Sequence, residues 1–311
     1  MNEFQNLGLD EPILKAVNDL GFTKPSEVQA KCIPVLLESE TDLVALAQTG
    51  TGKTAAFGLP LIQLIDFKSR NPQGVILCPT RELCLQITGD LKQFARYTPN
   101  AQIVAVYGGA DIRDQISRIR KGVQIIVATP GRLLDLIKRK AVELGRVAFA
   151  VLDEADEMLN MGFQEDIDHI LAQTPGDKRT WLFSATMPNA AEKIADTYMA
   201  CPVTVTAGSR NKAAENISHA CYIIKEKDRY AALKRMIDYT PDVFGLIFCR
   251  TRRETQTVAD KLMKDGYNAE ALHGDLSQTQ RDQVMKKFRE QTLQLLVATD
   301  VAARGLDVDD I

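Results

Sequence analysis

The chain alternates short apolar runs with longer mixed stretches, and this alternation predicts its elements. The mixed stretches, such as residues 81–97, have the spacing of amphipathic helices. Apolar strands that alternate with helices are typical of βαβ units around a buried parallel sheet, so the pattern predicts an α/β fold. The first six apolar runs are DLVALA (42–47), GVILC (74–78), IVAVY (103–107), IIVA (125–128), FAVL (149–152) and TWLF (180–183).

A polar stretch rich in small residues, 206–219, suits a linker, and the strand pattern resumes after it. VILCPTRE from residue 75 resembles LIFCRTRR from residue 246, and IIVAT from 125 resembles LLVAT from 295. Two matches at nearly one offset favour two copies of one fold over chance similarity of apolar strands. With the same offset, the counterpart of LDEAD (152–156) would fall beyond Ile311, so we expect the second domain to be incomplete. We expect domain 1 over 1–207, a linker over 208–218 and domain 2 over 219–311. The later runs are CYII (221–224), GLIFC (245–249), AEAL (269–272) and LQLLVA (293–298).

The bulk properties narrow the class of protein. The net charge of −3 excludes the strong basic bias of many nucleic-acid binders, and any such binding needs a local groove. The six cysteines have no C-x-x-C spacing and suit buried positions in a reduced, cytoplasmic protein. Neither a signal segment nor an 18-residue apolar run indicates a membrane.

Polar clusters follow five of the apolar runs directly. These clusters are QTGTGKT, PTREL, TPGR, DEAD and SAT. Because ligands of parallel sheets bind outside the carboxyl ends of the strands, we expect the five clusters to meet along one rim.

The first cluster indicates phosphate binding. AQTGTGKT (47–54) fits the P-loop pattern except that Ala47 replaces the first glycine. Gly50 and Gly52 let backbone amides face a phosphate chain, Lys53 would reach the β- and γ-phosphates, and Thr54 would hold Mg²⁺. The candidate ATP-binding residues of this segment are Ala47, Gln48, Thr49, Gly50, Thr51, Gly52, Lys53 and Thr54.

The DEAD cluster has two interpretations. Asp153, Glu154, Asp156 and Glu157 could form an acidic helix start, or they could serve a divalent cation that carries a nucleotide. A P-loop NTPase needs an acidic residue at the end of a second strand to hold the metal. We therefore expect Asp153 and Thr54 to hold Mg²⁺, and Glu154 to position the attacking water. The candidate catalytic residues are Lys53, Asp153 and Glu154, whereas Glu157 keeps the helix-start interpretation.

These motifs together resemble the DEAD-box family of ATP-dependent RNA helicases (superfamily 2). The resemblance implies two tandem RecA-like domains with ATP and Mg²⁺ as cofactors. GFTKPSEVQ (21–29) resembles the family's Q motif, within residues 2–30, and implies that Gln29 reads the adenine edge. Phe4 or Phe22 would stack near the base, with core packing as the alternative for either. Asp307 would face the nucleotide from the second domain.

The resemblance also implies contacts with RNA. Hydroxyls, guanidinium groups and bare amides suit a sugar–phosphate backbone and carry no base code, so binding should be largely sequence-independent. The alternative for Arg81 and Arg132 is pairing with carboxylates at helix starts. Asp156, Ser184 and Thr186 would couple hydrolysis to strand separation. The candidate RNA-binding residues are Pro79, Thr80, Arg81, Gly109, Thr129, Arg132, Arg250 and Thr299.

The implied activity is ATP-dependent unwinding of RNA duplexes. The family's last, arginine-rich motif is not found in the 311 residues, so we expect them to bind ATP but hydrolyse it weakly. Two other interpretations remain open from the motifs: an ATP-gated RNA clamp that anchors other proteins, and a duplex-DNA motor of related fold. Ribosomal or RNA-decay partners are not identified by the sequence.

Overall fold

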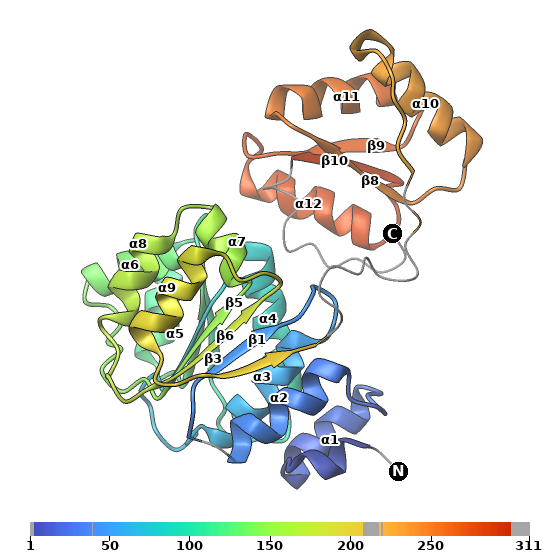
Figure 1. The fold of residues 1–311 in the computed structure, drawn as a ribbon. Helices are drawn as coiled ribbons and strands as arrows, with labels where there is room; N and C mark the ends of the chain where they lie inside the picture. Colours follow the sequence, from blue (N-terminus) through green and yellow to red (C-terminus); the bar gives the residue numbers. More distant parts are fainter. Residues whose placement is uncertain (1–2, 39, 208–217, 219, 300–311) are drawn as a thin grey trace. The chain divides into compact units, whose positions relative to one another are not determined.

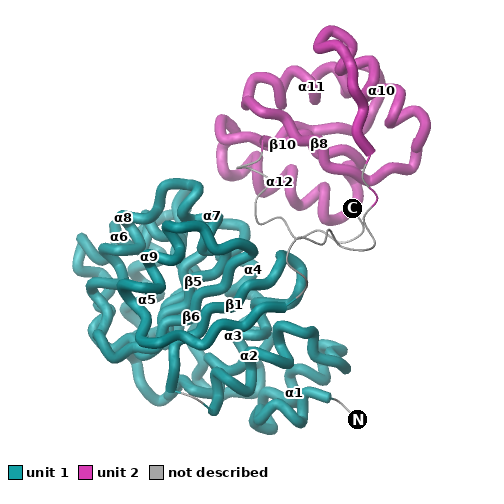
Figure 2. The backbone as a smooth tube through the Cα atoms, in the orientation of Figure 1, with its two compact units in different colours: residues 1–212 teal, residues 213–311 magenta. Residues whose placement is uncertain are grey.

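The described chain forms two compact units, 1–212 and 213–311, each built on a parallel sheet (Figure 2). The computed structural model describes residues 3–38, 40–207, 218 and 220–299. The predicted α/β class with two parallel-sheet domains is confirmed. Apart from residue 218, the predicted linker 208–218 lies outside the described residues. None of the helices in the described ranges is both long and apolar enough to span a membrane.

Unit 1 has a seven-stranded sheet in the order β3-β4-β2-β5-β6-β1-β7, with parallel pairing between all neighbours. Each of the six predicted runs overlaps one strand, and the edge strand β7 was not predicted. The strands are β1 (Leu43–Leu46), β2 (Gly74–Leu77), β3 (Ile103–Val106), β4 (Ile125–Ala128), β5 (Phe149–Asp153), β6 (Arg179–Ser184) and β7 (Val203–Thr206).

Helices cover both faces of this sheet (Figure 1). Ile76 and Val151 face one apolar cluster, while their neighbours Val75 and Leu152 face the other. Burial on both faces explains why these strands read as continuous apolar runs. The helices are η1 (Glu3–Leu7), α1 (Glu11–Asp19), α2 (Glu27–Glu38), α3 (Lys53–Leu64), α4 (Arg81–Phe94), α5 (Ile112–Arg120), α6 (Pro130–Lys138), α7 (Ala155–Asn160), α8 (Gln164–Leu171) and α9 (Asn189–Tyr198).

Unit 2 repeats part of unit 1, as the two sequence matches predict. Val75 of β2 pairs with Ile126 of β4, and Leu246 of β8 pairs with Leu296 of β10 at the corresponding positions. Its sheet has the order β8-β10-β9. Its elements are η2 (Glu226–Asp228), α10 (Arg229–Tyr239), β8 (Gly245–Cys249), α11 (Arg252–Lys264), β9 (Ala269–Leu272), α12 (Gln278–Arg289) and β10 (Leu295–Thr299).

One predicted strand is absent from the described part of unit 2. Residues 221–224 form no strand, and Ile223 is 99% exposed. Their apolar side chains pack against no sheet, so the expectation of a strand there was wrong. The cysteine expectation holds for Cys32, Cys78, Cys84 and Cys249, which are buried as free thiols, whereas Cys201 and Cys221 are exposed.

Candidate functional site

The strand order of unit 1 divides its carboxyl rim into two halves. Strands β5, β6 and β1 are neighbours, and they carry the DEAD, SAT and P-loop clusters. Strands β3, β4 and β2 are also neighbours, and they are followed by Gly108 and Gly109, by TPGR and by PTREL, in that order. We call the first three strand ends the nucleotide half and the other three the RNA half, after the ligands that the sequence predicts for them.

The P-loop lies between β1 and the first residue of α3, Lys53. Gly50 and Gly52 adopt φ angles of +75° and +88°, which glycine accepts without strain. A Cβ on Gly52 would also lie 2.4 Å from Gln29 Nε2. The Lys53 ammonium is buried and donates to the Ala47 carbonyl at 3.2 Å. The backbone turn of the P-loop is therefore already formed, and the Lys53 side chain folds back over it.

The remaining P-loop residues lie at the surface. Gln48, Thr49 and Gly50 are exposed, and the Thr51 hydroxyl donates to the Gln48 carbonyl at 2.7 Å. Thr54 is half-buried in the first turn of α3. Amides at the start of this 12-residue helix face a surface that can receive an anion.

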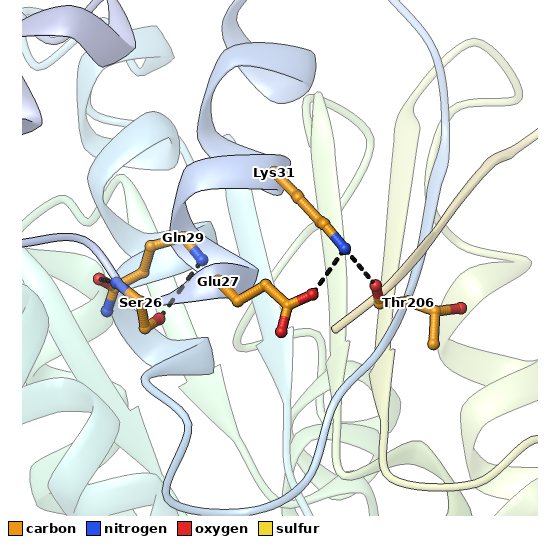
Figure 3. Close-up of polar contacts among 5 residues, drawn as sticks. All are labelled: Ser26, Glu27, Gln29, Lys31 and Thr206. Carbon is orange, nitrogen blue, oxygen red and sulfur yellow. Dashed lines mark hydrogen bonds and ion pairs between the residues drawn. The ribbon is translucent and has the colours of Figure 1, made fainter. Parts of the chain in front are cut away.

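Gln29 of α2 joins the Q-motif segment to the P-loop. Its Oε1 accepts from the Ser26 backbone N–H at 2.9 Å, and its Nε2 donates to the Gly52 carbonyl at 3.1 Å. On the same helix, Lys31 bridges Glu27 at 2.7 Å and the Thr206 carbonyl at 2.9 Å, which ties α2 to the end of β7 (Figure 3). The amide of Gln29 is thus placed at the P-loop, and its contact with adenine remains a prediction.

The two candidate aromatic residues differ in exposure. Phe4 is fully buried, and its ring stacks on Phe22 with centroids 6.3 Å apart. Phe22 also contacts the edge of Phe94 and is 37% exposed. Of the two, only Phe22 presents a surface that a base could reach.

The acidic cluster lies at the end of β5. Asp153 is 2% exposed, and its Oδ1 accepts from the Glu154 N–H at 3.0 Å. Burial raises the pKa of Asp153, while the charge of Lys53 and the Glu154 N–H lower it. Burial, with the neighbouring Asp153, raises the pKa of Glu154 to about 7. Glu154 has a φ of +51°, an uncommon conformation for a residue with a side chain and a common one at functional sites.

These groups fit a magnesium–nucleotide complex. The charge of Lys53 acts on both Asp153 and Glu154, so the P-loop lysine and the carboxylates share one small region. The Thr54 hydroxyl and the Asp153 carboxylate are hard oxygen ligands of the kind that Mg²⁺ prefers. The open glycine turn and the buried lysine supply donors for phosphate oxygens. A cation between the two sides would also offset the crowded carboxylates.

The three candidate coupling residues are joined by hydrogen bonds between α7 and the SAT segment at the end of β6. The Asp156 N–H donates to Ser184 Oγ at 3.3 Å. The Thr186 N–H and hydroxyl both donate to Asp156 Oδ2, at 3.0 and 2.7 Å. Asp156 is 6% exposed and Ser184 fully buried, whereas Thr186 is exposed, so the network is shielded from water on its Asp156–Ser184 side. The SAT segment is therefore fixed to the helix that follows the two catalytic candidates.

In the RNA half, the PTREL segment is largely buried. Pro79 and Thr80 are both buried, and Thr80 Oγ1 caps α4 by accepting from the Leu83 N–H at 3.2 Å. Arg81 is half-buried, with its guanidinium 4.8 Å from the centre of the Tyr107 ring. Thr80 thus acts on its own helix, and Arg81 is the more accessible of the two.

The other two strand ends of this half meet at one loop. Gly109 is exposed, with a φ of +79°. Arg132 Nη1 donates to the Ala110 carbonyl at 3.1 Å, in place of the carboxylate that the alternative interpretation required. Thr129 is half-buried, and its N–H donates to the Val106 carbonyl at 3.0 Å.

The candidates in unit 2 belong to a different body. The Arg250 N–H donates to Glu254 Oε2 at 3.2 Å, just after β8. Thr299 ends β10 and pairs with Cys249. Asp307 lies outside the described residues.

Sequence reasoning missed Tyr107 and Gln115, which contact the RNA half. The Gln115 Nε2 donates to the Tyr107 carbonyl at 3.0 Å. The available signal was a glutamine on the apolar side of an amphipathic helix, where a hydrophobic residue would be expected.

Relatives match this chain over nearly its whole length. The chain is 45% identical over 311 residues to ATP-dependent RNA helicase CshA of Listeria monocytogenes, and spans 59% of that protein. It is 45% identical over 308 residues to ATP-dependent RNA helicase DeaD of Escherichia coli K12, and spans 49% of it. Among solved structures it is similar to S. cerevisiae Dbp5 bound to RNA and ADP BeF3, with a TM-score of 0.89 and 30% identity, covering 99% of this chain and 78% of that one.

Two family patterns match the two units. The helicase conserved C-terminal domain matches residues 228–311, within unit 2. The DEAD/DEAH box helicase pattern matches residues 26–194, more than half of the chain, and these include the P-loop, the DEAD cluster and the SAT network. The chain therefore belongs to the DEAD/DEAH box helicase family.

Proposed function

We propose that this protein is an ATP-dependent RNA helicase that couples binding and hydrolysis of Mg²⁺-ATP to RNA binding and local duplex unwinding. The observation that carries the proposal is the buried Lys53, whose charge reaches both Asp153 and Glu154 beside the pre-shaped glycine turn. Such a site supplies the lysine, the metal ligand and the carboxylate that phosphoryl transfer to water requires.

Each residue of the nucleotide half has one role in this proposal. Backbone amides of residues 48–53 and the Lys53 ammonium hold the phosphate chain, and Gln29 and Phe22 hold the base. Thr54 and Asp153 hold Mg²⁺, which would offset charge on the phosphate oxygens when bound. Glu154 accepts a proton from the attacking water as a general base.

Binding of RNA is proposed for the other half of the rim. Arg81, Gly109 and Arg132 offer guanidinium and amide donors without a base code, which favours contacts with the sugar–phosphate backbone. Choice of RNA over DNA is supported by the relatives CshA and DeaD, which are named ATP-dependent RNA helicases, and by the RNA in the Dbp5 structure. The network of Asp156, Ser184 and Thr186 would carry coupling between the two halves.

One assay tests the proposal as a whole. Single-stranded RNA, single-stranded DNA and no nucleic acid are compared as activators of ATP hydrolysis, and a short RNA duplex is tested for strand separation. We expect RNA to stimulate hydrolysis more than DNA does, and strand separation to need ATP. A rate of ATP hydrolysis that RNA does not change, in a protein that still binds ATP, would contradict the RNA assignment.

A further inference from the structure

The loop 107–110 in the RNA half is held from three sides. At its start, the Arg81 guanidinium lies over the Tyr107 ring, 4.8 Å from its centre. Beneath it, the Gln115 Nε2 donates to the Tyr107 carbonyl at 3.0 Å. At its end, Arg132 Nη1 donates to the Ala110 carbonyl at 3.1 Å. The loop thus joins the ends of β2, β3 and β4, which sequence motifs describe separately.

The middle of this loop faces solvent. Gly108 and Gly109 are exposed, and Gly109 has a φ of +79° that favours glycine. A loop with two glycines has many accessible conformations, and fixing one of them costs entropy. Contacts at both ends of the loop are therefore needed if its amides are to face a ligand in one arrangement.

A glutamine at position 115 is unfavourable for stability, so stability alone does not explain it. The side chain is 4% exposed on α5, yet its Oε1 has no hydrogen-bond partner among the described residues. A buried acceptor without a partner destabilises the fold, and an apolar residue of similar size would avoid this cost. What the glutamine adds is its Nε2 donor, and that donor holds the loop.

Tyr107 holds the Arg81 guanidinium by its flat face. Stacking on an aromatic ring leaves the edge of a guanidinium to its other contacts, and Arg81 Nη1 is buried at this position. Stacking also restricts a long side chain that would otherwise lose entropy when it binds phosphate. The pair therefore restricts the Arg81 side chain to a position beside the loop.

We propose that Tyr107 and Gln115 are positioning residues, which hold the loop 107–110 so that Arg81, Gly109 and Arg132 present their donors to the RNA backbone together. The proposal rests on the proposed function, because it specifies how the same half of the rim binds RNA. Neither residue needs to touch RNA; each acts through the loop or through Arg81.

The first test uses Gln115→Met, which keeps the volume and removes the donor. The variant is titrated into a labelled single-stranded oligoribonucleotide of mixed sequence, with Mg²⁺ and a non-hydrolysable ATP analogue. We expect RNA affinity to fall about tenfold, the loss typical of one positioned charge contact. We also expect an unchanged or higher melting temperature and unchanged affinity for the ATP analogue. Ser117→Ala, at an exposed position of the same helix, is the control.

The second test separates the ring of Tyr107 from its hydroxyl. Tyr107→Phe keeps the stacking surface and should bind RNA like the unaltered protein, whereas Tyr107→Leu should bind about tenfold more weakly. Loss of a positioned arginine should also lower the slope of log affinity against log salt by up to about one. The matched control is Tyr97→Leu, which removes an Arg96–tyrosine pair at the far end of α4.

The outcomes distinguish the two proposals. If the unaltered protein binds no RNA, the proposed function fails. If it binds RNA and both Gln115→Met and Tyr107→Leu bind equally well, the positioning role fails while the function stands. A melting temperature and nucleotide affinity that fall together in Gln115→Met would also overturn the positioning role, because the side chain would then support the whole unit.

Discussion

The nucleotide half and the RNA half of the unit 1 rim carry different kinds of group. In the nucleotide half, Lys53, Asp153 and Asp156 are charged residues that are at most 6% exposed, and burial raises the pKa of Asp153. In the RNA half, Arg81 and Arg132 are half-buried, and the glycines between them are exposed. One sheet thus places buried charge at the ends of β1 and β5, and half-buried or exposed donors at the ends of β2, β3 and β4.

The difference has a physical consequence for binding. Buried charges interact strongly because little water screens them, and they suit a small ligand of fixed charge and shape. Salt screens the interactions of accessible arginines and amides, and such groups can bind nucleic acids of many sequences. They therefore suit a long polyanion. We therefore expect substitutions in the nucleotide half to have large effects on one ligand, and those in the RNA half to have smaller effects that depend on salt.

The largest expected effect is on hydrolysis. Glu154→Gln removes the proposed general base but keeps the size of the side chain, so ATP turnover should fall about 10²- to 10⁴-fold while ATP binding persists. Turnover is measured with saturating RNA and binding with a fluorescent ATP analogue. Unchanged turnover would show that another group accepts the proton.

The next effect is on nucleotide affinity. Lys53→Ala removes a buried ammonium that offsets two carboxylates, and affinity for Mg²⁺-ATP should fall by about a hundredfold or more. The control is Lys31→Ala, since Lys31 lies on α2 and bridges Glu27 at the surface. An equal loss of affinity in both variants would mean that the loss reflects the overall charge of the protein and not the buried site.

A smaller effect is expected in the RNA half. Arg132→Ala should weaken RNA binding about tenfold and lower the salt slope by about one, while ATP affinity stays the same. Arg139→Ala, at the other end of α6 and paired with Asp135, serves as the control. A change in ATP affinity with Arg132→Ala and not with Arg139→Ala would contradict the division of the rim into two halves.

The smallest effect concerns coupling. Thr186→Val removes the hydroxyl that donates to Asp156 at 2.7 Å, one of two hydrogen bonds from Thr186 to that carboxylate. We expect the factor by which ATP tightens RNA binding to fall about three- to tenfold, with each ligand bound alone almost as before. Thr197→Val on α9, which loses a hydroxyl bond to a carbonyl, should leave the factor intact.

The nucleotide half could be predicted closely from the sequence. Gly50, Gly52 and Lys53 follow an apolar run at fixed spacing, and Asp153 ends a second run, so local pattern and strand ends together place them. In contrast, the order of the strands could not be predicted, because it depends on which apolar faces pack together. That order decides which strand ends are neighbours.

The contacts that hold the RNA half were not predictable in the same way. Gln115 lies eight residues from Tyr107 on a separate element, and only the folded chain brings its amide to that carbonyl. In addition, strand β7 was not predicted, and the strand expected at 221–224 is absent. Strand β7 alternates polar and apolar residues at a sheet edge, and residues 221–224 are apolar but pack on no described sheet.

The central claim is that one Mg²⁺-nucleotide complex joins the P-loop to Asp153. Calorimetric titration of ATP into the unaltered protein and Asp153→Asn, each with Mg²⁺ and with EDTA, tests it most directly. We predict saturable binding that Mg²⁺ strengthens in the unaltered protein, and loss of that strengthening in the variant. No saturable binding, or the same dependence on Mg²⁺ in both proteins, would contradict the claim.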